Sequence, residues 1–123
     1  MRHLFILGLG YSGSFIRAAA RARGWRVSGT GRAGELDFAD EGAVRAALAE
    51  ATHVLSSIPP AEGQDPVLAR YGDALGAGWL GYLSSTGVYG DTGGAWVDES
   101  APTLLDQIGT GRRTARAEAD AAW

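Results

Sequence analysis

Short apolar runs alternate with amphipathic stretches along the whole chain. The apolar runs have the composition of buried strands, and they occupy residues 2–7, 25–30, 34–38, 52–60 and 79–85. The stretches between and after them predict helices over residues 12–24, 41–51, 66–78 and 111–123. Strands that alternate with helices indicate parallel βαβ units, so the pattern predicts an α/β fold.

The predicted architecture is a Rossmann-type, doubly wound parallel sheet of five strands. If the first strand is central, the strand order is 3-2-1-4-5, and the third strand, over residues 34–38, is very short. We expect residues 1–123 to form a single domain, because no linker or repeat interrupts the pattern. The fifth strand is expected at an edge of the sheet, where a homo-oligomer or residues beyond Trp123 would complete the pairing.

The first predicted helix has an apolar face opposite its arginines, as an amphipathic helix requires. Ser12 is its candidate N-cap and Gly24 its expected stop, and Asp40 is the candidate N-cap of the next predicted helix. The apolar face carries Phe15, Ile16, Ala19 and Ala20.

Composition and charge narrow the classes of function. The net charge is −3, whereas nucleic-acid-binding surfaces are basic, so we expect no nucleic-acid partner. The chain has no Cys, and His3 and His53 lack the spacing of metal ligands, so we expect no metal site. No apolar run is long enough to span a membrane, and the first run has no signal-peptide cleavage site. We therefore expect no membrane partner and a cytoplasmic location.

A glycine motif follows the first predicted strand. Gly8, Gly10 and Gly13 fit the pattern G-x-G-x-x-G, with Tyr11 and Ser12 between the last two glycines. In a strand–turn–helix context, the three glycines allow a tight turn, close approach of a pyrophosphate, and close packing of helix on strand. The helix N-terminus then offers N–H groups to the anion. These residues predict a dinucleotide site; an ordinary glycine-rich turn is the alternative.

The residue after the second predicted strand bears on the choice of dinucleotide. NAD sites place a carboxylate there for the ribose 2′-hydroxyl, but this chain has Arg32. A guanidinium can bind a 2′-phosphate with two N–H donors, so NADP is favoured over NAD. The alternative is a solvated surface arginine.

Two further segments are expected near the cofactor. Asp37 and Phe38 follow the third predicted strand, where they would flank an adenine ring; a turn aspartate and a core phenylalanine are the alternative. Ser57, Ile58 and Pro59 end the fourth predicted strand and would line the cofactor crevice, unless they form a plain turn.

Six motifs together resemble the short-chain dehydrogenase/reductase (SDR) superfamily. They are GLGYSG, GTGR, LDFAD, YLSSTGVYG, WVDES and RRTARAE. The resemblance is to the extended branch, the NAD-dependent epimerase/dehydratase family, and within it to the atypical members. It covers the whole chain but less than half of a usual family member, whose later strands and C-terminal lobe form the substrate pocket. It implies an NAD(P)-binding Rossmann fold and hydride transfer on a small carbonyl or nucleotide-sugar-like substrate.

The resemblance also implies catalytic residues, and here the chain departs from the family. The family's catalytic Ser or Thr corresponds to Ser85 in YLSSTGVYG. Its Tyr and Lys, four residues apart, correspond to Thr110 and Thr114, and the chain contains no Lys. That Lys lowers the pKa of the Tyr so that the phenolate forms near neutral pH. Tyr89 is the candidate substitute acid, with a packing role as the alternative.

Two functions stay open on this evidence. One is an atypical SDR oxidoreductase or epimerase/dehydratase that uses NADP and a small-molecule substrate. The other is a non-catalytic NADP(H)-binding or sensor module, or a fragment of a larger enzyme, which the missing Tyr–Lys pair favours.

Overall fold

The computed structural model of the chain describes residues 1–89, 92–101, 103 and 112–123. The chain groups into two compact units. The first unit contains Met1–Ile58 and Val67–Leu83, and the second contains Pro59–Pro66 and Ser84–Trp123. Among the described residues, no helix is long and apolar enough to cross a membrane.

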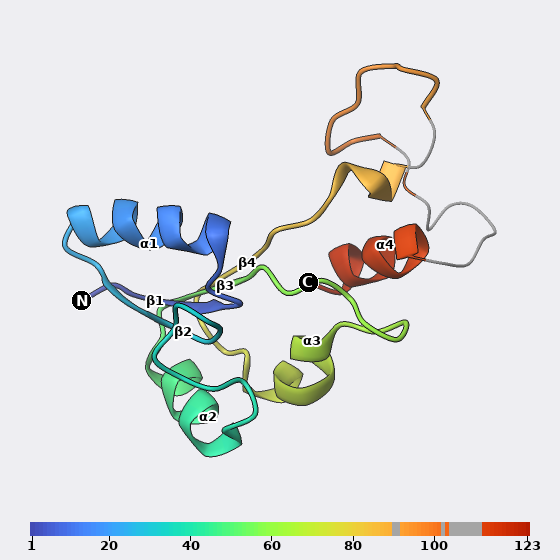
Figure 1. Cartoon of the computed structure of the whole chain (residues 1–123). Helices are drawn as coiled ribbons and strands as arrows, with labels where there is room; N and C mark the ends of the chain where they lie inside the picture. The colour runs from blue at the N-terminus through green and yellow to red at the C-terminus, as the bar shows by residue number, and fades with distance from the viewer. Residues whose placement is uncertain (90–91, 102, 104–111) are drawn as a thin grey trace. The chain divides into compact units, whose positions relative to one another are not determined.

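A four-stranded parallel sheet forms the centre of the first unit (Figure 1). Its strands are β1 (His3–Leu7), β2 (Arg26–Gly29), β3 (His53–Ser56) and β4 (Trp79–Tyr82). The strand order is β2-β1-β3-β4, with Leu4 opposite both Val27 and His53, and His53 opposite Trp79. Every pair is parallel, so the predicted α/β fold with a parallel sheet is confirmed.

The predicted strand over residues 34–38 is wrong as a strand. Leu36 makes an isolated parallel bridge to Thr30, so four strands replace the five expected. The reason is local. The N–H of Gly29 points away from β1 and donates to the Glu35 carboxylate at 3.0 Å, whereas a strand over residues 34–38 would need that N–H for one of its backbone carbonyls. The predicted order 3-2-1-4-5 is therefore observed as β2-β1-β3-β4, and the Thr30–Leu36 bridge stands in place of the predicted third strand.

Helices cover both faces of this sheet. α1 (Tyr11–Ala22) lies over one face, while α2 (Glu41–Glu50) and α3 (Pro66–Tyr71) lie on the other (Figure 1). A short 3₁₀ helix, η1 (Gly72–Ala74), follows α3. The Asp40 side chain caps α2 by accepting from Ala43 N at 3.2 Å, as the sequence predicts.

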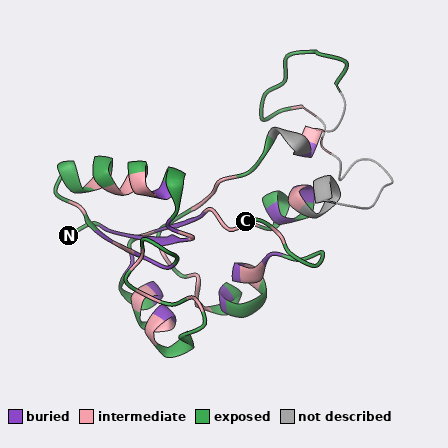
Figure 2. Cartoon of the chain, viewed as in Figure 1, coloured by how far each residue is buried: buried purple, intermediate pink, exposed green. Residues whose placement is uncertain are grey.

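The buried residues of the first unit lie in β1, β2 and β3 and in the helices and turns that pack on them (Figure 2). On the α1 face, Ile16 and Ala20 pack against a buried cluster. The cluster consists of Leu4, Ile6, Leu9, Val27 and Leu55. Phe15, expected on the core-facing side of α1, is instead 66% exposed. Ile16 and Ala20 lie at the centre of the helix surface that packs on the sheet. Phe15 and Ala19 lie one turn apart beside them, outside that surface, and both are exposed.

The second unit contains the short 3₁₀ helix η2 (Thr86–Tyr89) and the helix α4 (Arg112–Ala122), which confirms the predicted last helix. Val88 of η2 is buried, as are Ala117 and Ala119 of α4. The indole N–H of Trp123 donates to Asp65 Oδ2 at 2.9 Å, so the residue just before α3 is joined to the residue just after α4.

Candidate functional site

The turn between β1 and α1 requires glycine at its first position. Gly8 has a φ of +89°, a backbone conformation that other residues adopt only with strain. A Cβ at Gly8 would also lie 2.7 Å from Ser57 Oγ and 2.8 Å from Ile58 Cγ1. Glycine is therefore required at position 8 for two reasons: the turn has a positive φ there, and the end of β3 lies too close to leave room for a Cβ.

Two side chains from neighbouring strand ends hold this turn in place. The Thr30 hydroxyl accepts from Gly8 N at 3.1 Å, and the Thr30 carbonyl accepts from Leu9 N at 2.6 Å. On the other side, the Ser57 hydroxyl donates to the Gly8 carbonyl. Thr30 is 1% exposed, and sequence reasoning missed it. The available signal was a lone hydroxyl between Gly29 and Gly31, where β2 reaches the glycine turn.

The start of α1 is open to a ligand. Gly10 is its N-cap and provides no side-chain cap, and a Cβ at Gly10 would meet nothing within 4 Å. Ser12, expected as the N-cap, lies instead in the first turn and is exposed, because the helix begins at Tyr11. The first N–H groups of a helix have no acceptor within it, so they favour an anion at the start of α1.

Gly13 has the close packing that the motif requires. It is buried, and a Cβ there would lie 3.4 Å from Ile6 Cγ2 and 3.5 Å from the Gly8 carbonyl oxygen. The three glycines thus have three different environments: crowded with positive φ at Gly8, open at Gly10, and packed at Gly13.

Arg32 follows β2 in an exposed loop. The loop is tied to α1, because the Arg17 guanidinium donates to the Ala33 carbonyl at 2.8 Å. The carboxylate nearest in sequence, Glu35, accepts from Gly29 N and pairs with Arg21 at 3.5 Å. Arg32 is thus an exposed cation in this loop, and the Glu35 carboxylate already has two partners of its own.

Asp37 and Phe38 have partners within the fold. Asp37 Oδ1 accepts from Ala39 N at 2.9 Å, which forms a turn, and Phe38 packs edge-to-face on Tyr71 with ring centroids 5.2 Å apart. Burial raises the pKa of the Tyr71 hydroxyl, which donates to the Phe38 carbonyl. Contact of either residue with an adenine ring stays a prediction.

The expected crevice residues at the end of β3 divide between the units. Ser57 and Ile58 lie in the first unit beside Gly8, whereas Pro59 is exposed in the second. The Ser57 hydroxyl is directed at the glycine turn itself.

The expected catalytic residues lie together in the second unit. Ser85 and Tyr89 line a cavity of about 270 Å³ with Ser84, Val88 and Asp120. The Ser84 hydroxyl donates to Asp120 Oδ2 at 2.5 Å, which joins the segment before η2 to α4. Thr110, the position of the family's Tyr, lies outside the described residues, as does the side chain of Thr114. Sequence reasoning missed Asp120, since only the fold brings it to Ser84.

The predicted site residues thus form two groups. The first unit contains the glycine-loop residues together with Arg32, Asp37, Phe38, Ser57 and Ile58. The second unit contains Pro59, Ser85 and Tyr89. Among the described residues, no group of His, Asp or Glu side chains could hold a metal ion.

Comparisons with known proteins identify the fold. Neither a scan against protein-family models nor a search of curated proteins finds a match. Solved structures do match, among them the following two. A conserved protein of unknown function from Silicibacter pomeroyi is 35% identical, with a TM-score of 0.77 over 100% of this chain and 48% of its own. A short-chain dehydrogenase/reductase superfamily protein from Agrobacterium tumefaciens, with bound NAD, is 19% identical, with a TM-score of 0.70 over 98% of this chain and 44% of its own.

The chain thus spans about half the length of these two solved proteins. Its likeness to the Agrobacterium structure, at 19% identity, is a likeness of fold. The chain has the Rossmann-like parallel α/β fold that its sequence predicts, and it shares that fold with a member of the SDR superfamily.

Proposed function

We propose that this chain binds a nicotinamide dinucleotide at the glycine turn between β1 and α1. The observation that carries the proposal is the open space at Gly10, directly before the uncapped N-terminus of α1. A pyrophosphate needs both features: backbone without a Cβ in its path, and N–H groups directed at its oxygens. The bound NAD of the Agrobacterium protein, which has the same fold, supports the proposal.

The residues present fit such a cofactor. Gly8 shapes the turn, Gly10 leaves room for the phosphates, and the N–H groups of Tyr11, Ser12 and Gly13 in the first turn of α1 would bind their oxygens. The partial positive charge at the helix N-terminus adds to this attraction.

We favour NADP(H) over NAD(H). Arg32 is exposed just past β2, where it would bind a 2′-phosphate with two N–H donors. The neighbouring Glu35 carboxylate is paired with Arg21 and bonded to Gly29 N, which leaves it poorly placed for a ribose hydroxyl. Asp37, Phe38 and Ile58 are the candidate contacts for the rest of the cofactor.

We further propose a function of the atypical SDR type. The nicotinamide would supply hydride transfer, as in an oxidoreductase or an epimerase/dehydratase acting on a small carbonyl or nucleotide-sugar-like compound. Ser85 would donate a hydrogen bond to the substrate oxygen, and Tyr89 or a water molecule would handle the proton. Both side chains line the same cavity in the second unit.

A non-catalytic NADP(H)-binding or sensor role is the second candidate. The observation that favours it is the absence of any Lys from the chain, since no such side chain is present to lower the pKa of a catalytic Tyr. An Arg cannot replace that Lys as a proton shuttle, because it stays protonated.

A fluorescence titration with NADPH and, separately, NADH tests the binding. We expect Arg32→Ala to weaken NADPH binding about tenfold, roughly 1.4 kcal/mol, and to leave NADH binding unchanged. Arg26→Ala is the matched control: it removes the same charge at the other end of β2, where Arg26 pairs with Glu50 at 3.3 Å. Absence of binding by either nucleotide would refute the proposal.

Turnover distinguishes the two candidates once binding is established. A screen of carbonyl and nucleotide-sugar substrates with NADPH should detect activity that Ser85→Ala removes while NADPH binding remains. Binding without turnover on any substrate in the screen would favour the non-catalytic role.

A further inference from the structure

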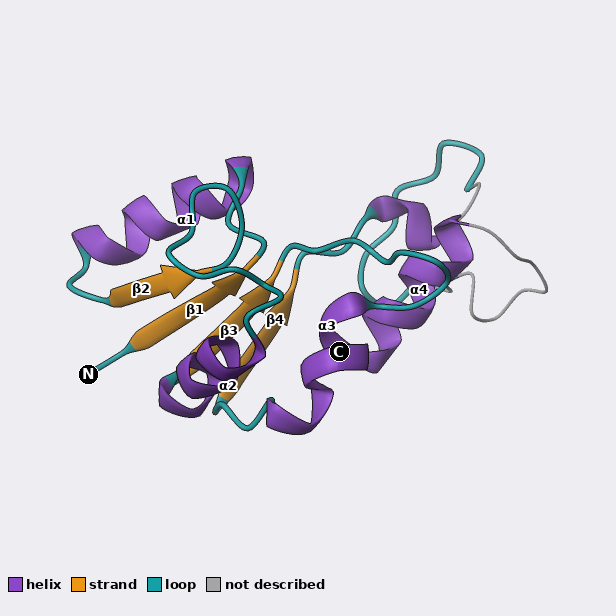
Figure 3. Ribbon diagram, turned by 60° about the horizontal axis from the view of Figure 1, so that its bottom comes forward, coloured by secondary structure: helices purple, strands orange, loops and turns teal. Residues whose placement is uncertain are grey.

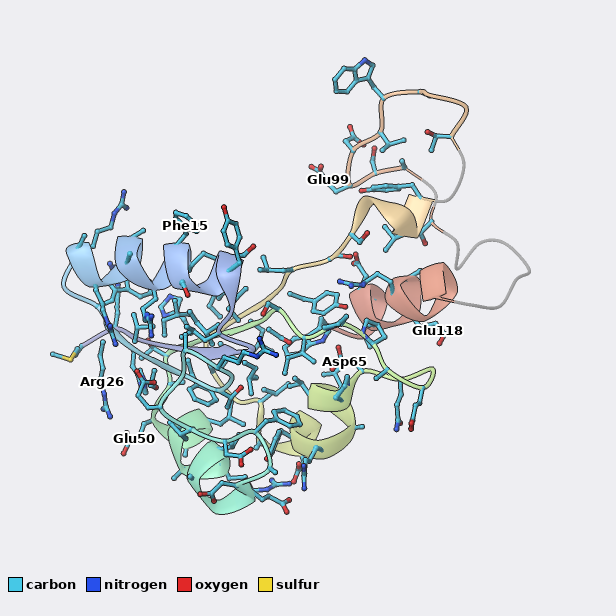
Figure 4. All side chains as sticks on the ribbon, in the orientation of Figure 1. Phe15, Arg26, Glu50, Asp65, Glu99 and Glu118 are labelled. Carbon is cyan, nitrogen blue, oxygen red and sulfur yellow. The ribbon has the colours of Figure 1, made fainter. Side chains whose placement is uncertain are left out.

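The outer face of α1 is apolar, and nothing in the first unit covers it. Tyr11, Phe15, Ala18 and Ala22 recur at the spacing of one helical face, and all four are exposed. Tyr11 is 84% exposed and Phe15 66%, and their rings pack edge-to-face with centroids 5.2 Å apart (Figure 4 labels Phe15). The solvent face of a surface helix normally carries charged residues, so this α1 stripe requires an explanation.

The charged residues of α1 are directed elsewhere. Arg17 donates to the Ala33 carbonyl at 2.8 Å, and Arg21 donates to the Val27 carbonyl at 3.3 Å and pairs with Glu35. Both arginines therefore lie on the side of the helix that faces β2 and the loop after it. The α1 stripe lies on the other side and is left without charge.

An apolar groove lies next to α1 on the same face of the sheet. Its volume is about 500 Å³. Helix α1 and the strands beside it form its walls and floor, and its lining includes Ile16, Ala19, Ala20, Trp25, His53 and Trp79. Parallel sheets are normally covered on both faces. Within the first unit, α2 and α3 cover the opposite face, whereas α1 is the one helix on this face, above β1 and β2 (Figure 3).

Trp79 shows that no other part of the first unit covers the groove. A Cβ at Gly81 would lie 2.3 Å from the Trp79 ring, so the indole lies over Gly81 on β4, and Trp79 is still 48% exposed. His53 lies between Trp79 and Trp25, with ring centroids 5.9 Å and 4.6 Å away respectively. These residues begin or precede strands, so the groove lies at the end of the sheet opposite the glycine turn.

We propose that a second copy of this chain docks here, with the α1 stripe of each copy seated in the groove of the other about a two-fold axis. A two-fold interface requires one surface that is complementary to itself, and the first unit carries both halves: an uncovered groove and an unexplained apolar helix face. The small side chains of Ala19 and Ala20 leave room in the groove for the Phe15 and Tyr11 rings of the partner. The proposal does not rest on nucleotide binding.

The exposed area is of the right size. Aromatic side chains offer about 150–250 Å² each, so Tyr11, Phe15 and Trp79 at their observed exposures would bury about 400 Å² per copy. A standard interface buries about 800 Å² per partner. The three rings would thus supply about half of it, and the exposed Ala18 and Ala22 of the stripe add to that area. Pairing of two β4 edges, one of the two arrangements that the sequence suggested, would leave both the stripe and the groove in water.

Sedimentation equilibrium over a range of concentrations tests this proposal. We expect a species with twice the 12.8 kDa mass of one chain, and we expect Phe15→Glu to weaken its association at least about a hundredfold, the scale of a hot-spot residue. Ala49→Glu, on the exposed side of α2, adds the same charge elsewhere and should leave the dimer intact. Because Phe15 is exposed, both variants should keep the circular dichroism of the parent chain.

Two results would overturn the proposal. One is a monomer at every concentration, which would mean that something other than a second copy covers the groove. The other is a dimer that Phe15→Glu leaves as stable as the Ala49→Glu control, as β4 edge pairing predicts.

Discussion

Replacing Gly10 with Ala separates ligand binding from folding in this chain. A Cβ at Gly10 meets no protein atom within 4 Å, and the residue has a φ of −117°, outside the left-handed region that favours glycine. The added methyl group would therefore enter only the open space before α1. If a pyrophosphate occupies that space, the methyl group lies in its path.

The expected effects on stability and binding differ in size. An Ala is a poorer N-cap than Gly by about 0.5–1 kcal/mol and is disfavoured at the Gly10 ψ of −140°, outside the β region, but it also restricts the unfolded chain, so stability should fall by about 1 kcal/mol. A hydrogen bond to a charged group contributes about 1.5–3 kcal/mol. Displacing the phosphates from one such bond should therefore weaken binding by about thirtyfold, close to 2 kcal/mol.

The assay pairs a urea unfolding curve with an NADPH titration. Gly42→Ala is the control, because Gly42 lies in α2 and a Cβ there also meets nothing within 4 Å. We expect both variants to unfold near the parent midpoint and only Gly10→Ala to lose affinity. If Gly10→Ala binds NADPH as tightly as the parent chain, the phosphates do not pass over Gly10, and our assignment of the site is refuted.

Three more predictions concern the residues around this turn. Gly8→Ala should lower the Tm by roughly 10 °C, because strain at positive φ and the clash with Ser57 together cost about 3 kcal/mol; an unchanged Tm in a thermal scan would contradict this. Thr30→Val should destabilise the chain by about 1–3 kcal/mol in urea, since Gly8 N would lose its acceptor. Burial lowers the pKa of His3, so the folded state binds fewer protons than the unfolded state; stability should be full above about pH 6.5 and fall as the pH drops through the folded pKa. Urea midpoints at pH 7.5 and 5 should show a smaller difference in His3→Gln than in the parent chain.

Local patterns accounted for most of the fold. β1, the glycine turn and α1 are adjacent in sequence, so an apolar run, three glycines and a helical period sufficed to predict them. The same holds for Asp40 as the cap of α2. The strand expected at 34–38 failed because its pairing depends on the Glu35 side chain, which takes the N–H group of Gly29 that a strand would need.

The contacts that shape the candidate site come from distant parts of the chain. Thr30 and Ser57 reach the glycine turn from the ends of β2 and β3, 22 and 49 residues away from Gly8. Asp120 reaches Ser84 across 36 residues. Motif spacing cannot show such pairs, because they exist only after the strands have aligned. Periodicity also misled at Phe15, since an apolar helix face does not reveal which part of it packs on the sheet.

The bonds from Thr30 and Ser57 to the glycine turn have a consequence for the entropy of binding. Fixing the backbone of one residue costs about 1–2 kcal/mol of conformational entropy. Both backbone polar groups of Gly8 are held by hydrogen bonds within the fold: its N–H by the Thr30 hydroxyl and its carbonyl by the Ser57 hydroxyl. A ligand would therefore meet a turn already ordered by folding, and its affinity would not be reduced by the need to order it. Calorimetry on the parent chain and Thr30→Val should show this as a more unfavourable binding entropy in the variant.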